Sequence, residues 1–204
     1  ERCHACDAPL AGSLPIRKTL RIDNVETLPA ERITANDEER VRQGFDVQTV
    51  FSWPKRDGVV DLKQVELATA DEPLATLQYA NSADIMRLNL GLKRRAEKTI
   101  MGFLINPATG YWAKQDDEVD EAQRDPEESY PERIVPIVQD RKNALLIRVA
   151  DPDVWSSTAL TTVQHALLRG IEIVFQLEEG EVLGEPLPDR DNRRTILFYE
   201  ATEG

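Results

Sequence analysis

Two cysteines near the start of the sequence have the spacing of a metal-binding turn. Cys3 and Cys6 are the only cysteines among the 204 residues, and they form a Cys-x-x-Cys pair. Two thiolates at this spacing supply half of the four ligands of a tetrahedral structural zinc. The favoured interpretation is a zinc half-site at Cys3 and Cys6, completed by residues before Glu1 or by a partner. Reduced free thiols and a thiol redox pair remain the alternatives.

No catalytic signature accompanies this pair, and no catalytic residue is assigned. The sequence lacks the GxxxxGK[ST], GxGxxG, GxSxG and HExxH patterns, so a nucleotide site, a hydrolase elbow and a zinc protease have no support. His4 lies between the cysteines, and His165 is interpreted as a packed or hydrogen-bonded helix residue. A metal-dependent nuclease is a further alternative, with Asp84, Glu172 and Glu200 as its carboxylates.

The bulk composition predicts a globular protein of the cytoplasm. Hydrophobic residues make up 41% of the chain and charged residues 30%, an ordinary globular balance. No apolar run is long enough to span a bilayer, and no signal peptide or disulfide framework is visible, so we expect a cytoplasmic location without membrane partners. The start at Glu1, without Met, suggests a piece of a longer protein.

The net charge of −12 opposes electrostatic binding of nucleic acid over the whole surface, but the charge is unevenly distributed along the chain. Much of the acid falls in the segment 115–131, which its charge and prolines predict to be a flexible loop. A basic cluster of Lys93, Arg94, Arg95 and Lys98 is the candidate nucleic-acid contact. Among the aromatic residues, Trp53, Tyr111 and Trp112 could stack on single-stranded bases or could belong to the core or to strand edges.

The elements that would position these residues are mostly strands. Period-two alternation predicts a strand at Phe45–Trp53 that forms a hairpin with another at Val59–Ala68. A nearly continuous apolar run predicts a central strand at Ala144–Val149. Further strands are expected at Leu14–Ile22, Leu74–Ala80, Ile85–Leu90, Thr99–Ile105, Arg133–Val138, Ile171–Leu177 and Thr195–Tyr199.

Two helices are expected among these strands. Residues 36–43, capped by Asn36 and ended by Gly44, predict a short surface helix. A long helix should begin at Asp151-Pro152, end at Gly170, and pack through an apolar stripe of Trp155, Ala159, Val163, Ala166 and Leu167. The predicted class is therefore α+β, mostly antiparallel strands with one long packed helix and a short surface helix, preceded by a zinc-ribbon half. The predicted domains are a zinc knuckle at 1–15 and the α+β body at 16–204.

Four segments in order resemble a region of known helicases. They are RITANDEERVRQGF at 32–45, ADIMRL at 83–88, ALLRGIE at 166–172 and ILFYEATEG at 196–204. The chain resembles the C-terminal domain of unknown function of DEAD/DEAH-box-type superfamily 2 helicases, of the mitomycin repair factor and DISARM phage-defence type.

This resemblance implies an accessory region of an ATP-dependent DNA helicase or translocase in DNA repair or antiviral defence. The motor domains would lie upstream in the parent protein, and ATP and Mg would bind there and not to this chain. The region would help to bind DNA or dock a repair or defence subunit. The alternative is a protein–protein interaction module of a defence complex without DNA contact, which the acidic balance favours.

Overall fold

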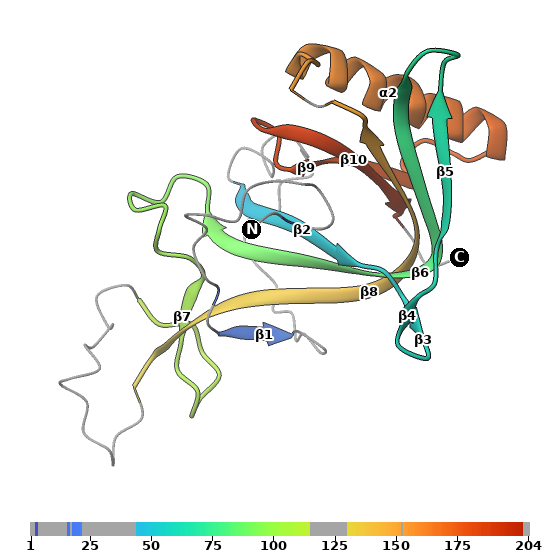
Figure 1. Ribbon diagram of the computed structural model, residues 1–204. Coiled ribbons are helices and arrows are strands. Elements are labelled where there is room, and N and C mark those ends of the chain that lie inside the picture. Colours follow the sequence, from blue (N-terminus) through green and yellow to red (C-terminus); the bar gives the residue numbers. More distant parts are fainter. Residues whose placement is uncertain are drawn as a thin grey trace. The chain divides into compact units, whose positions relative to one another are not determined.

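The computed structural model describes Cys3, Ile16 and residues 18–21, 44–114, 130–151 and 153–201. The elements in chain order (Figure 1) are β1 (Thr19–Arg21), β2 (Phe45–Ser52), β3 (Lys55–Arg56), β4 (Val59–Val60), β5 (Lys63–Ala68), β6 (Pro73–Leu92), β7 (Phe103–Ile105), β8 (Glu132–Val149), α2 (Ser157–Phe175), β9 (Val182–Pro188) and β10 (Arg193–Glu200). Mostly antiparallel strands with one helix in the described ranges confirm the α+β class.

The chain divides into two compact units, each assembled from separate stretches of sequence. Unit 1 comprises Glu1–Ser13, Phe51–Ile85 and Asp140–Gly204. Unit 2 comprises Leu14–Val50 and Met86–Gln139. The strands β2, β6 and β8 contribute residues to both units, and each unit is described by itself below. The predicted division into 1–15 and 16–204 stays a prediction.

In unit 1, the strands β8, β10 and β9 lie side by side in that order as antiparallel neighbours, with an apolar layer on each face. Leu197 of β10 lies opposite Leu146 of β8, and both are fully buried in one cluster. Their neighbours Ile196 and Ile147 belong to a second cluster, because successive side chains of a strand point to opposite faces. The predicted central strand at Ala144–Val149 is thus confirmed as the last part of β8, between β6 and β10.

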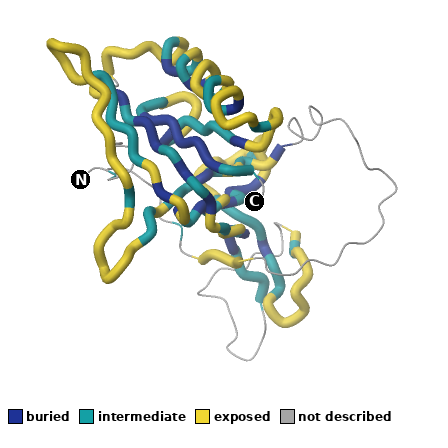
Figure 2. Tube along the Cα trace, turned by 90° about the vertical axis from the view of Figure 1, so that its right-hand side faces the viewer, coloured by how far each residue is buried: buried dark blue, intermediate teal, exposed yellow. Residues whose placement is uncertain are grey.

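The helix α2 covers the face of these three strands that holds the second cluster (Figures 1 and 2). It begins at an N-cap Ser156, whose side chain accepts a hydrogen bond from the Ala159 N–H, and it ends at the left-handed C-cap Gln176. The predicted start at Asp151 and end at Gly170 are therefore wrong, as is the strand predicted at Ile171–Leu177. An interior glycine costs a helix only about 1 kcal/mol relative to alanine, which packing of the following turn offsets.

The buried side of α2 also differs from the predicted stripe. Val163 packs on these strands as expected, but Trp155 and Leu167 are exposed. Two polar residues, Gln164 and Glu172, are buried in their place. Both are bonded: Gln164 Nε2 donates to the Gly184 carbonyl at 2.6 Å, and Glu172 accepts from Arg169 at 2.8 Å. A polar side chain can face a core when its bonds are satisfied there, which an apolar-stripe rule does not anticipate.

The strands β5 and β6 form the long hairpin of unit 1, joined by a short turn (Figure 1). Lys63 lies opposite Tyr79, and Leu67 lies opposite Ala75. The predicted hairpin of Phe45–Trp53 with Val59–Ala68 is therefore wrong, because β2 and β5 both pair with β6. The turn residues between them instead close the small β3–β4 hairpin. The strands predicted separately at Leu74–Ala80 and Ile85–Leu90 merge into β6, and those at Arg133–Val138 and Ala144–Val149 merge into β8.

Unit 2 has a smaller core, centred on Leu88, Leu90 and Val135. In this unit the start of β8 pairs with β1 in parallel and with β7 in antiparallel fashion. A close approach of two backbones joins these strands at Gly102, which has φ +84° and where a Cβ would lie 2.1 Å from the Ile134 carbonyl oxygen. Only glycine fits this position, so the chain can turn tightly into β7.

Several predicted features fall outside the described residues. These are Cys6, His4 and most of the 1–15 knuckle, the short helix at 36–43, and positions 115–129 of the acidic loop. The zinc-ribbon half and the short surface helix therefore stay predictions.

Candidate nucleic-acid interface

A short β-hairpin in unit 2 presents aromatic side chains. Its first strand is β7, and its second contains Trp112, which pairs with Ile105 in an antiparallel bridge. Asn106 holds the turn, because its side-chain oxygen accepts hydrogen bonds from two following backbone N–H groups at 3.0 and 3.3 Å. The hairpin thus carries Phe103 on one strand, and Tyr111 and Trp112 on the other.

Three aromatic rings form a continuous row on this hairpin and on β2. The ring of Phe103 lies between those of Phe45 and Trp112, with centroid distances of 6.0 and 5.7 Å and edge-to-face geometry. Phe45 exposes 50% of its surface and Trp112 exposes 60%, so the outer rings of the row face solvent. We call Phe45, Phe103 and Trp112 the aromatic row. Exposed aromatic rings of this kind are the platforms on which unpaired bases stack.

The two tryptophans predicted as stacking candidates lie in different environments. Trp53 packs against the first apolar cluster of unit 1 and makes an edge-to-face contact with Phe51, 5.0 Å between ring centroids. The core interpretation therefore applies to Trp53, and Trp112 keeps the stacking interpretation. Tyr111, the third candidate, exposes 78% of its surface beside Trp112 in sequence.

The basic loop predicted to contact nucleic acid begins next to the aromatic row, because the Lys93 N–H donates to the carbonyl of Gly44 at 2.9 Å. Its four basic residues have different roles. Arg95 is anchored: Nη1 donates to the Asp46 carboxylate at 2.8 Å, and Nη2 donates to the Lys98 carbonyl at 3.2 Å. The Lys98 ammonium donates to the Lys93 carbonyl. Lys93 and Arg94 are exposed, and their side chains bond no described residue, so these two are available to phosphates.

Charge differs between the described parts of the two units. The described residues of unit 2 include nine Lys and Arg against three Asp and Glu, whereas those of unit 1 include ten against seventeen. The three acids of unit 2 are Asp46, Glu97 and Glu132, and Asp46 and Glu132 are paired with basic side chains. Over its full residue range, however, unit 2 contains 14 Lys and Arg against 17 Asp and Glu, and unit 1 contains 11 against 20. Both units are therefore acidic, and the basic excess belongs only to the described residues of unit 2.

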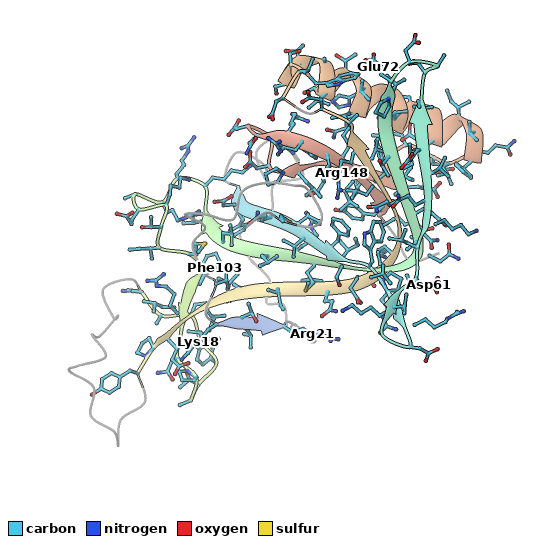
Figure 3. The ribbon with its side chains drawn as sticks, viewed as in Figure 1. Lys18, Arg21, Asp61, Glu72, Phe103 and Arg148 are labelled. Atoms are coloured by element: carbon cyan, nitrogen blue, oxygen red, sulfur yellow. The ribbon has the colours of Figure 1, made fainter. Side chains whose placement is uncertain are left out.

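A groove of about 600 Å³ lies over the start of β8, between β1 and the hairpin. Its apolar walls include Leu20, Ile105 and Ile134, and its polar edge is the ion pair of Lys18 with Glu132, 2.9 Å between Nζ and Oε2. Figure 3 labels Lys18 and Phe103 on either side of this end of β8. Sequence reasoning did not find this groove, because its two charged residues stand 114 positions apart.

The groove and the aromatic row share one face of unit 2. Phe103 lies directly opposite Ile134, and Ile105 directly opposite Glu132, and opposed residues of an antiparallel pair point to the same side. The row therefore continues into the groove, and one strand of nucleic acid could follow both.

The predicted zinc ligands are described only in part. Cys3 is half-buried and packs against the first apolar cluster of unit 1, while Cys6 lies outside the described residues. Among the residues that the structure describes, no group of three or more His, Cys, Asp or Glu side chains is arranged to hold a metal ion. The zinc half-site at Cys3 and Cys6 stays a prediction.

The three carboxylates proposed for a nuclease bind different partners. Asp84 pairs with Arg141 at 3.4 Å, Glu172 with Arg169 at 2.8 Å, and Glu200 accepts from the Asn143 side chain at 2.7 Å. They do not form a shared metal-binding group within the described ranges. His165 lies on α2 and is exposed, not packed as expected from the sequence.

No helix within the described ranges is long and apolar enough to cross a membrane. A scan against protein-family models, a search of curated proteins and a search of solved structures find no match to this chain.

Proposed function

We propose that this chain is an accessory nucleic-acid-binding region of a larger DNA helicase or translocase, and that unit 2 contacts single-stranded DNA. The observation that carries the proposal is the aromatic row on an exposed face of unit 2, next to Lys93 and Arg94, whose side chains bond no described residue. Bases would stack on the rings while the basic side chains contact phosphates. This combination binds single strands without sequence preference.

The charge of the described part of unit 2 supports the same assignment. Nine basic against three acidic residues are described there, so phosphates could be attracted locally although unit 2 as a whole contains 14 basic and 17 acidic residues. Contacts must be local, because charges farther away than about 10 Å are screened at 0.1 M salt. The helicase context comes from the sequence resemblance, and the four resembling segments contribute residues to both units.

Binding of a fluorescein-labelled oligothymidine to the purified chain tests this proposal by anisotropy. We expect saturable binding that weakens with salt, and quenching of Trp112 emission on titration with the unlabelled strand. Trp112→Phe removes the reporting indole but keeps a stacking ring, and should retain most of the affinity. Absence of binding at 50 mM salt would overturn the proposal.

A second candidate function has support in unit 1. The last turn of α2 exposes three adjacent apolar side chains, Ile173, Val174 and Phe175, by 76%, 73% and 68%. An exposed apolar patch on an acidic unit favours docking of a protein partner, here the motor region of the parent helicase. Phe175→Ser should reduce association with that region in a pull-down and leave DNA affinity unchanged. Normal association of this variant would exclude the patch as a docking surface.

A further inference from the structure

The groove beside the aromatic row has a hydrogen-bonding edge formed by one ammonium and one carboxylate. Lys18 Nζ donates to Glu132 Oε2, and the second carboxylate oxygen, Oε1, bonds no described residue. The side chains of Lys18 and Glu132 expose 56% and 37% of their surface, so a ligand can reach both. An ammonium next to a carboxylate therefore presents two remaining donor hydrogens and at least two acceptor positions on the rim of an apolar groove.

We propose that this groove binds an unpaired guanine of the DNA strand that stacks on the aromatic row. The inference extends the proposed function, because it assumes that unit 2 holds a single strand. On its Watson–Crick edge guanine carries the acceptor O6 beside two donors, N1–H and the N2 amino group. Lys18 would donate to O6, and the Glu132 carboxylate would accept from N1–H and N2–H.

The other bases fit this edge less well. Adenine and cytosine each present a single amino donor on that edge, and thymine presents a single ring N–H, so none can give the carboxylate two adjacent hydrogen bonds. A carboxylate engaged by only one donor keeps less of the interaction that offsets its desolvation. Apolar walls at Leu20, Ile105 and Ile134 would cover the faces of the base, as is usual for ligand sites.

The groove is also continuous with the proposed path of the strand. Ile105 and Ile134 line the groove and lie on the same face as Phe103, the central ring of the row. A base that leaves the row at Trp112 would enter the groove without crossing to the other face. The proposed guanine is therefore the base adjacent to those stacked on the row.

The test uses oligothymidines with one central substitution, bound to the 204-residue chain and measured by anisotropy. The substitutions are guanine, hypoxanthine, which lacks only the N2 amino group, and 2-aminopurine, which lacks O6 and N1–H. Loss of a hydrogen bond to a charged group weakens binding by about tenfold, so we expect guanine to bind about tenfold tighter than hypoxanthine. Glu132→Gln should reduce this ratio to about one, because the amide offers one acceptor oxygen in place of the two of the carboxylate.

A matched control is Glu97→Gln, which removes another exposed carboxylate of unit 2 and should leave the guanine preference intact. Equal affinities for guanine and hypoxanthine in the unchanged chain would overturn the groove assignment and leave the single-strand proposal standing. If oligothymidine itself does not bind, the proposed function and the groove assignment both fail. If free GMP competes as strongly as the guanine-substituted strand, the groove binds a free nucleotide. That outcome would overturn the proposal that it binds a guanine of the DNA strand.

Discussion

Unit 1 and unit 2 differ in how deeply they bury apolar side chains and in how strongly acidic they are. In unit 1, Ala83, Leu146 and Leu197 are completely buried, and α2 covers a second cluster on the other face. In unit 2, the most buried members of the core, Leu88, Leu90 and Val135, expose 4% to 9%, and large aromatic rings remain in solvent. Unit 1 contains 20 Asp and Glu against 11 Lys and Arg, whereas unit 2 contains 17 against 14 and is closer to neutral.

The net charge and composition of the whole chain are therefore averages over two regions that differ in packing and in their exposed side chains. Unit 1 has the features of a stable scaffold, because tightly packed cores supply most of the free energy of folding. Unit 2 keeps the rings of Phe45 and Trp112 exposed, which forgoes the stabilisation of burying them and is expected where a surface binds a ligand.

The largest expected effect is the loss of stability when the core of unit 1 is truncated. Leu197→Ala removes a side chain with no exposed surface and should lower the free energy of unfolding by about 2 to 5 kcal/mol. Ile173→Ala, a comparable change at an exposed site, should cost less than about 0.5 kcal/mol. Urea denaturation measures both. Equal effects would mean that unit 1 is not the scaffold.

Truncation of the aromatic row should affect binding and not stability. Trp112→Ala should weaken oligothymidine binding by about 1 to 3 kcal/mol, or about tenfold to a hundredfold, because one stacked base loses its ring. Trp155→Ala is the matched control, since Trp155 is an exposed tryptophan of unit 1. An equal loss for both variants would remove the functional difference between the units.

Neutralisation of the unbonded cations should change the salt dependence of binding. Lys93→Gln with Arg94→Gln should flatten the slope of log affinity against log salt by about 1.4, since each phosphate contact on a single strand contributes about 0.7. The same number of charges removed from unit 1, by Lys63→Gln with Arg190→Gln, should leave the slope unchanged. A slope that responds equally to both pairs would contradict a local interface in unit 2.

The smallest expected effect is the loss of an ion pair in unit 1, between Asp140 and Lys142. A hydrogen bond from the buried ammonium of Lys142, 2.7 Å away, lowers the pKa of Asp140 below its usual value near 3.8. Because the folded pKa is the lower one, the stabilisation is present above the unfolded pKa and is lost as the pH falls through the folded value. Asp140→Asn should cost about 1 kcal/mol at pH 7, and the difference from the unchanged chain should shrink towards pH 3.

Urea denaturation at both pH values checks this expectation, and Asp71→Asn, in an exposed turn, is the control. A difference that stays constant between pH 7 and pH 3 would mean that the pair does not contribute through ionisation of Asp140.

Much of the local structure could be predicted from the sequence, whereas the pairing of strands and the packing of side chains could not. Alternation over Phe45–Ser52 indicated a strand, and the apolar run at 144–149 indicated a central strand, because side-chain periodicity reflects which face is buried. The same reasoning ended the long helix at Gly170, although α2 continues to Phe175. There, packing of Ile171 and the Arg169–Glu172 pair outweigh the intrinsic cost of glycine.

The candidate site was predictable only as a list of residue types. The basic cluster at 93–98 and the exposed Trp112 were both identified. The sequence could not separate the anchored Arg95 from the exposed Arg94, nor the half-buried Trp53 from Trp112. Those distinctions depend on the Asp46 carboxylate and on the apolar cluster of unit 1, which come from distant stretches of the chain.

The sequence by itself determined the α+β class, the positions of most strands and the uneven distribution of charge, since these depend on neighbours within a few residues. Only the tertiary structure decided that Phe45, Phe103 and Trp112 form one row, and that Lys18 reaches Glu132 across 114 positions. Strand pairing joins residues without regard to their separation in sequence, because register is set by which faces must be buried together. For that reason the groove and the aromatic row exist only in the folded chain.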